Sequence, residues 1–155
     1  MANVIRVAPR AFALMVLVAI FLPNTLLAQE AIAVVAQIKG GVNVERSGTT
    51  STVAQGDALF TADVVRTGSD AAIGLRFTDG ALIALGPDTV YAVDTYSFDT
   101  GDGRGDFLST VERGSLSIRS GRIAKQGQDR MRLRTPASIL GVRGTRFLVR
   151  VDPED

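Results

Sequence analysis

The stretch that decides the fold is DVVRTGSDAAIGLRFTDGALIALGP, residues 63–87. It contains two apolar runs, residues 72–77 and 81–85, which are separated by Thr78-Asp79-Gly80. Asp-Gly between alternating apolar runs predicts a β-hairpin with a type I′ turn, in which both central residues have positive φ. Because side chains alternate across a strand, one face of the first strand is formed by Ile73, Leu75 and Phe77.

Further short apolar segments lie on both sides of this hairpin, with turn residues between them. The predicted strands are 42–46, 89–93, 96–98, 131–134, 139–142 and 146–151. A second hairpin is predicted from 107–112 and 115–118 around Arg113-Gly114, whereas residues 47–52, 99–106 and 120–129 are predicted loops. Strands at this spacing predict an all-β single domain, either β-solenoid-like or a twisted sandwich, preceded by an N-terminal signal helix.

The N-terminal residues have the pattern of a secretory signal. Arg6 and Arg10 precede the apolar run 11–22, and Leu26-Leu27-Ala28 offers a cleavage site. The alternative is a short anchor that is never cut. We expect a signal peptide over 1–28, a linker over 29–35, a domain over 36–151 and a tail over 152–155. The chain has no cysteine, which fits a periplasmic or secreted protein without disulfides. After cleavage we expect no stable membrane span.

Charge is distributed unevenly along the chain. Residues 29–112 hold five Lys and Arg against twelve Asp and Glu, whereas residues 113–150 hold ten against one. A basic segment can be a footprint for nucleic acid or for anionic surfaces. Here the basic residues alternate with apolar ones, which places them on the outer face of strands, and export argues against a nucleic-acid partner. We therefore expect the two segments to face each other and partly neutralise.

The residue types present exclude most catalytic sites. The chain has no His and no Cys, so Ser-His triads, thiol nucleophiles and the usual zinc sites are excluded. Carboxylate chemistry would have to use Asp57, Asp63, Asp70 and Asp79, all of which lie in predicted turns where Asp accepts local hydrogen bonds. We expect no enzymatic activity and no cofactor.

Two further features have a functional and a structural interpretation. The loop 99–106 contains Asp99, Asp102 and Asp106, which could surround a hard cation, but Arg104 breaks the EF-hand spacing. Arg66 and Arg143 could hold a partner carboxylate. We expect them instead to fix turns, because each is adjacent to a Thr-Gly or Gly-Thr pair.

Ordered motifs over residues 36–151 resemble the FecR domain family. They are Gly41-Val42-Asn43-Val44, Gly56-Asp57-Ala58-Leu59, Asp63-Val64-Val65-Arg66-Thr67-Gly68, Phe77-Thr78-Asp79-Gly80, Leu85-Gly86-Pro87, Thr135-Pro136-Ala137 and Gly141-Val142-Arg143-Gly144-Thr145-Arg146-Phe147. The structural motif positions carried over are Gly56, Asp57, Arg66, Thr67, Gly68, Asp79, Gly80, Gly86, Pro87, Thr135, Pro136, Gly141, Arg143, Gly144, Thr145 and Phe147.

The resemblance implies an all-β, solenoid-like domain that acts by protein contact outside the cytoplasm. Full-length regulators of this kind also restrain a sigma factor, but about ten residues precede the apolar run here, too few for that task. We expect an exported, non-enzymatic protein-binding or scaffolding module with a protein partner in the cell envelope. The alternative is an envelope lipid or glycan binding protein with a β-groove inside the fold.

Overall fold

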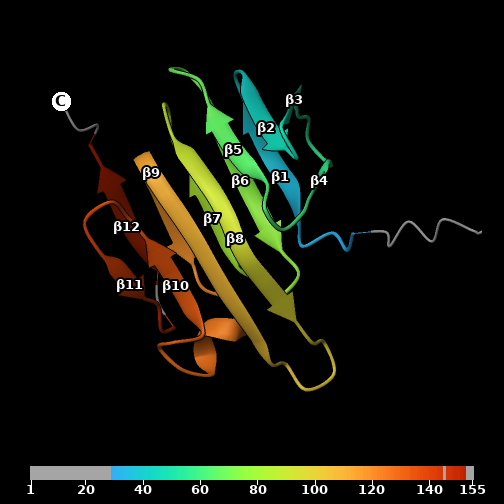
Figure 1. Cartoon of the computed structure of the whole chain (residues 1–155), viewed down its shortest axis with the longest axis vertical. Coiled ribbons are helices and arrows are strands. Elements are labelled where there is room, and N and C mark those ends of the chain that lie inside the picture. Colours follow the sequence, from blue (N-terminus) through green and yellow to red (C-terminus); the bar gives the residue numbers. More distant parts are fainter. Residues whose placement is uncertain (1–28, 145, 153–155) are drawn as a thin grey trace, which may run out of the picture.

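The protein is described by a computed structural model over residues 29–144 and 146–152, so the expected signal helix lies outside the described residues. The described part contains twelve strands and one 3₁₀ helix, η1 (Ile123–Lys125) (Figure 1). The strands up to the central hairpin are β1 (Ala33–Lys39), β2 (Val42–Arg46), β3 (Thr49–Thr52), β4 (Ala58–Leu59), β5 (Val64–Thr67), β6 (Ala72–Phe77) and β7 (Leu82–Leu85). The later strands are β8 (Val90–Phe98), β9 (Gly105–Arg119), β10 (Met131–Arg134), β11 (Ile139–Gly141) and β12 (Arg146–Val151).

The strands form one continuous sheet that curls on itself into a half-barrel. The front layer contains β3, β2, β5, β8, the first part of β9, β10 and β11; the rear layer contains β4, β1, β6, β7, the last part of β9 and β12 (Figure 1). All neighbours are antiparallel except β9 and β10. The all-β single domain is thus confirmed, and it is nearer to the twisted sandwich than to a solenoid because the two layers enclose one core.

The core lies between the two layers, and it is formed by every second side chain along the strands that enclose it. Ile73, Leu75 and Phe77 are buried, as the period of two predicts. Their counterparts from the front layer include Phe107, whose ring centroid lies 4.7 Å from that of Phe77. Tyr96 contacts the same two rings at 5.5 and 5.0 Å. Aromatic contacts at these distances hold the two layers together.

The central hairpin forms as predicted, but its turn is of another type. Gly80 N–H donates to Phe77 O at 3.0 Å, and Phe77 N–H donates to Ala81 O at 2.9 Å. Gly80 has a φ of +88°, whereas Asp79 is not among the residues with positive φ. The loop is therefore a three-residue connection with a glycine bulge rather than a type I′ turn.

The predicted second hairpin is wrong, because residues 105–119 form the single strand β9. The first part of β9 pairs with β8, and its last part pairs with β7 and β12. Gly114, with a φ of +96°, lies where the strand passes from the front layer to the rear. A glycine with positive φ thus marks a change of layer within one strand and not a chain reversal.

Other boundaries also differ from the sequence prediction. The predicted strands 89–93 and 96–98 merge into one strand, β8, which begins at Val90 and carries a bulge between Val93 and Thr95. Residues 49–52, predicted as loop, form the edge strand β3. The expected linker 29–35 is also wrong in part, since β1 begins at Ala33 and pairs with β4 and β6.

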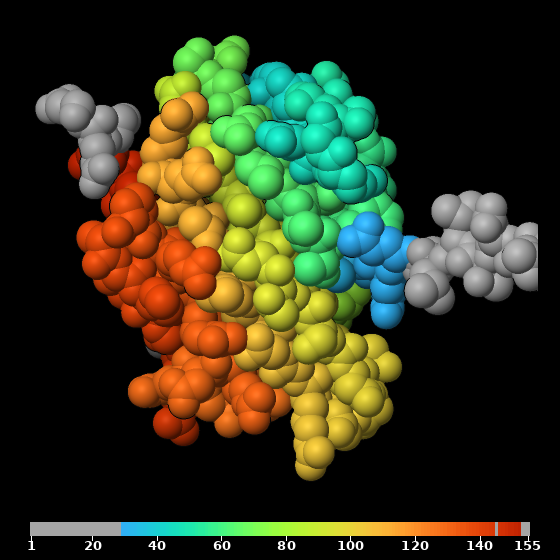
Figure 2. Space-filling model, in the orientation of Figure 1, coloured from blue at the N-terminus to red at the C-terminus, as the bar shows by residue number. Residues whose placement is uncertain are grey.

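In the described part of the chain, the acidic and basic segments are joined by a single ion pair, so they neutralise each other much less than expected. Within residues 29–144 and 146–152, one ion pair joins them, Arg132 Nη2 to Asp106 Oδ2 at 2.8 Å. The chain runs across the molecule from the N-terminal strands at one side to the C-terminal strands at the other (Figure 2). The basic residues of β10 and β12 therefore lie on the C-terminal side of the molecule.

Candidate functional site

Most of the motif residues expected from sequence stabilise turns. Thr67 Oγ1 donates to Gly86 O at 2.6 Å and accepts from Thr89 N–H at 2.8 Å. Gly68 N–H donates to Gly41 O at 3.0 Å. Pro87 O accepts from Thr89 Oγ1 at 3.1 Å. These bonds tie the turn between β5 and β6 to the turn between β7 and β8.

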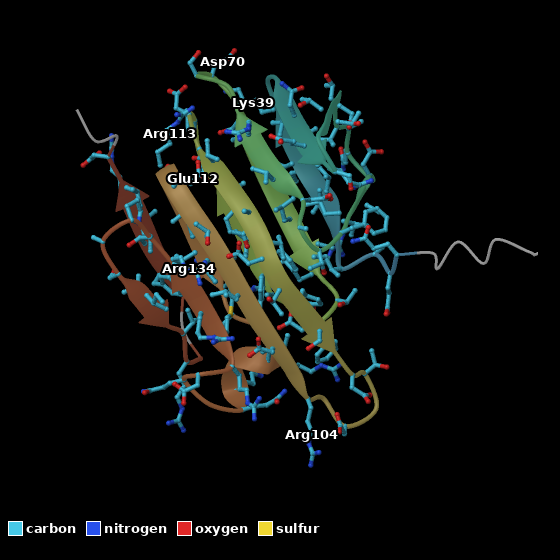
Figure 3. All side chains as sticks on the ribbon, viewed as in Figure 1. Lys39, Asp70, Arg104, Glu112, Arg113 and Arg134 are labelled. Carbon is cyan, nitrogen blue, oxygen red and sulfur yellow. The ribbon has the colours of Figure 1, made fainter. Side chains whose placement is uncertain are left out.

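The four candidate carboxylates lie in turns or accept hydrogen bonds that stabilise the fold. Asp57 Oδ2 accepts from Ala54 N–H at 2.8 Å beside Gly56, which has a φ of +93°. Asp79 is buried; its Oδ1 accepts from Ala81 N–H at 3.0 Å and its Oδ2 from Ile123 N–H at 3.3 Å. Asp70 is exposed in the turn after β5 (Figure 3).

Asp63 has a role that the sequence did not reveal. Its fully buried carboxylate accepts from Phe60 N–H at 2.9 Å and from Arg46 Nε and Nη2, both at 2.7 Å. This bidentate hydrogen bonding raises the pKa of the Arg46 guanidinium, which also lies 4.3 Å from the centroid of the Phe60 ring. Asp63 is therefore a buried anchor for Arg46 rather than a simple turn residue.

The two candidate arginines differ in environment. Arg66 Nη2 lies 3.4 Å from Glu45 Oε2 on the neighbouring strand β2, so Arg66 does not fix a turn as expected. Arg143 is exposed between β11 and β12, beside Gly144, which has a φ of +58°. Thr145 lies outside the described residues.

The acidic residues of the loop after β8 have separate partners. Asp99 Oδ1 accepts from Gly101 N–H at 2.7 Å, and Asp102 Oδ1 accepts from Arg104 N–H at 2.8 Å. Asp106 binds Arg132. In the described part of the chain, no three acidic side chains come together as a metal site would need.

The first candidate surface is the C-terminal open edge of the half-barrel, opposite the edge formed by β3 and β4. β11 pairs with β10 and β12 pairs with β9, and each ends its layer of the described sheet. A cleft of about 340 Å³ lies along this edge, and its lining includes Pro136, Leu140, Val149 and Val151. Motif residues gather here: Thr135 and Pro136 line the cleft, Gly141 ends β11, and Phe147 on β12 packs partly against the core.

The open edge is unusually apolar for an exposed surface. Leu148 is 74% exposed and Ile139 is 60% exposed. Both lie on strands whose outer hydrogen-bonding groups have no neighbouring strand in the described part of the sheet. Sequence analysis placed strands at these residues but could not show that they form an edge.

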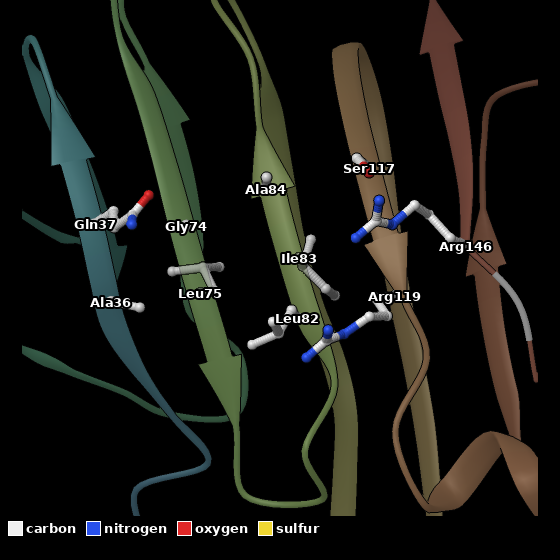
Figure 4. A pocket seen from close by; sticks show the side chains of 10 residues that line it. All are labelled: Ala36, Gln37, Gly74, Leu75, Leu82, Ile83, Ala84, Ser117, Arg119 and Arg146. Carbon is white, nitrogen blue, oxygen red and sulfur yellow. The ribbon is translucent and has the colours of Figure 1, made fainter.

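The second candidate surface is a hollow of about 320 Å³ on the outer face of the rear layer (Figure 4). Gly74, Leu82 and Ala84 form its floor, because their neighbours in sequence point into the core. Arg119 on β9 and Arg146 on β12 extend their guanidinium groups toward it. Sequence reasoning placed basic residues on the outer face of strands, but it did not identify these two as a pair.

Burial also affects two phenols. Burial raises the pKa of Tyr96 to about 12. It also raises the pKa of the fully buried Tyr91. A raised pKa often marks catalytic groups, but here the cause is desolvation within the core, which does not indicate catalysis.

The fold is an all-β single domain that carries two candidate surfaces. Residues 63–155 match the family described as FecR protein, so the chain belongs to the FecR family. FecR proteins are generally non-enzymatic signalling or sensor modules. The match begins at Asp63, so the motif pieces at 41–44 and 56–59 precede it.

No curated protein matches the chain, and no solved structure does. Among the residues placed by the structure, no helix has the length and apolar character to cross a membrane.

Proposed function

We propose that this protein is an exported, non-enzymatic FecR-type module that binds an extended segment of a protein partner in the cell envelope. The observation that carries the proposal is the open edge formed by β11 and β12. The N-terminal pattern of residues 1–28 and the absence of cysteine support a periplasmic or secreted location after cleavage near Ala28.

An edge strand offers a row of unpaired N–H and C=O groups to an incoming strand. β12 is six residues long, which is enough for a normal strand pairing. Soluble proteins usually protect such an edge, whereas Leu148 on β12 remains 74% exposed. Arg146 and Arg150 flank it, and these charges limit pairing between copies of the same chain.

The cleft beside β12 can supply selectivity. Leu140, Val149 and Val151 give it apolar walls, and Pro136 adds a rigid ring. In strand addition, main-chain bonds give affinity and pockets for alternate side chains give specificity. A partner strand with an apolar residue at every second position would pair its main chain with the β12 edge and place its apolar side chains in the cleft.

Site-specific photo-crosslinking in intact cells tests this proposal. A photoreactive residue at position 148 is expected to give one defined protein adduct, whereas one at the β2–β3 turn position 48 gives none. The double variant Ile139→Lys with Leu148→Lys should lose binding of the purified adduct partner. The control Val34→Lys, at a 38% exposed position on β1, should retain it. Equal binding by the double variant would refute the proposed edge.

A further inference from the structure

The hollow on the rear layer carries two arginines in an unfavourable arrangement. Arg119 and Arg146 are direct cross-strand partners on β9 and β12. Side chains in this register begin about 5 Å apart, and like charges placed so destabilise a sheet. Within the described chain neither arginine makes an ion pair, since the five pairs involve other residues. An anion bound between them would remove this repulsion.

A third arginine extends the same row. Arg76 on β6 is the partner of Leu82 on β7, and Leu82 is the partner of Arg119. The outer face therefore presents Arg76, Leu82, Arg119 and Arg146 in line across four strands. Positive charge flanks an apolar floor, which is complementary to a ligand with an anionic head and an apolar tail.

We propose that this hollow binds a single-chain anionic amphiphile. A carboxylate or phosphate head would accept hydrogen bonds from Arg119 and Arg146, and the first part of the chain would lie over Leu82, Ala84 and Gly74. Guanidinium groups bind such heads in a bidentate manner. The volume of about 320 Å³ is at the small end of ligand pockets, which fits one chain rather than two.

The backbone of the hollow distinguishes this ligand from a peptide. Its floor strands β6 and β7 are paired on both sides, so their N–H and C=O groups are already bonded within the sheet. A peptide laid across this face would find no backbone partners and would have to desolvate its own polar groups. An acyl chain has no hydrogen-bonding groups, so its contact with the apolar floor carries no such desolvation cost.

The site lies outside the packed interior. A groove inside the fold was the sequence-based expectation for a lipid binder, but core side chains such as Tyr91 and Phe107 fill the space between the layers. The proposed ligand instead rests on the outer face of the rear layer, where Arg146 of β12 belongs both to the hollow and to the β11–β12 edge. Gly74 on β6 is not part of that edge, so a change at Gly74 tests the hollow alone, and changes at Ile139 and Leu148 test the edge.

Gly74 allows the apolar half of the hollow to be filled without strain. A Cβ at this position would meet nothing nearer than the Gln37 Cβ at 3.7 Å, and Gly74 does not have positive φ. Gly74→Val should therefore fold, since a β-branched residue is favoured in a strand. Its side chain would occupy the space proposed for the acyl chain.

The test is an NMR titration of the full chain with dodecyl phosphate below its critical micelle concentration. Binding is measured from the changes in amide chemical shifts. Saturable shifts are expected at Gly74, Ala84 and Ser117. The double variant Arg119→Gln with Arg146→Gln, and separately Gly74→Val, should each weaken this binding by about tenfold or more. Laurate should bind at the same residues.

Two matched controls should bind as the unaltered protein does. Arg134→Gln removes an exposed charge from β10 in the front layer (Figure 3). Ala72→Val adds the same side chain to the same face of β6 but outside the hollow. The inference is overturned if the two test variants bind like these controls. It is also overturned if inorganic phosphate, dodecyl maltoside, an acidic peptide or phosphatidylglycerol vesicles bind as tightly at these residues.

Discussion

The side chain of Thr89 lies directly against Gly114, the residue at which β9 passes from the front layer to the rear. Thr89 Oγ1 accepts from Ser115 N–H at 3.1 Å and donates to Gly86 O at 2.9 Å. A Cβ on Gly114 would overlap Thr89. The buried threonine therefore fixes the position where one long strand changes layers.

Gly114→Ala should destabilise the fold by about 3 kcal/mol, since it combines positive φ with a steric overlap. Gly56→Ala is the matched control, because Gly56 has nearly the same φ, +93° against +96°, and open space around its Cβ. That control should cost about 1 kcal/mol. Urea unfolding measures both, and equal losses would show that the contact with Thr89 does not matter.

The buried carboxylate of Asp63 should be strongly coupled to Arg46. Arg46→Ala should cost about 3 kcal/mol, because it leaves the fully buried Asp63 carboxylate without its charge partner. Asp63→Ala should cost about 2 kcal/mol, because Phe60 N–H loses its acceptor while the half-exposed Arg46 is solvated by water. The double variant should cost clearly less than the sum of the two. The half-exposed pair Arg66 and Glu45 is the control, for which each change should cost less than about 1 kcal/mol. Additive losses for Asp63 and Arg46 in urea unfolding would contradict the coupling.

Asp79 should hold the η1 segment in place. Asp79→Ala removes the acceptor of two buried amides, Ala81 N–H and Ile123 N–H, and should cost about 2 kcal/mol. Hydrogen exchange of residues 121–125 should also become faster. Asp70→Ala, at an exposed turn, should change stability by less than about 0.5 kcal/mol. Unchanged exchange in Asp79→Ala would show that other contacts hold η1.

The fold should lose stability at alkaline pH. Burial raises the pKa of Tyr96 to about 12, whereas a phenol in the unfolded chain titrates near pH 10. A raised folded pKa means that this stability is complete below about pH 10 and is lost as the pH rises through about 12. Tyr91, whose pKa is also raised, acts in the same direction.

Phenolate absorbance checks this directly, because the chain has two tyrosines and no tryptophan. Both tyrosines should remain neutral in the folded protein near pH 10 and ionise as it unfolds. Tyr96→Phe should reduce the alkaline loss of stability without abolishing it. Titration of both phenols near pH 10 in the folded protein would contradict the role of burial.

Strand positions were more predictable than strand connections. The bounds of β2, β6, β10 and β12 follow from local alternation of apolar and polar residues. The continuity of β9 did not follow, because Arg113-Gly114 has the local composition of a turn. What decides between a turn and a change of layer is the contact with Thr89, which is 25 residues away in sequence.

The candidate surfaces show the same division. The basic and apolar alternation of residues 146–151 predicted arginines on an outer face. It could not predict that Arg146 lies opposite Arg119, since that register depends on how β12 docks on β9. Likewise the pairing of Arg46 with Asp63 joins residues that are brought together by β2 and β5.

The sequence by itself determined an all-β chain of the FecR type, its central hairpin and the class of residues available for chemistry. These properties depend on the alternation of side chains along a strand, on the turn residues and on the composition. None of them depends on which distant segments come into contact. Tertiary structure alone decided that β9 spans both layers, that β11 and β12 form an open edge, and that Arg119 meets Arg146. Those relationships arise because distant strands must bury their apolar faces against one another, and the resulting neighbours are not encoded in any single segment.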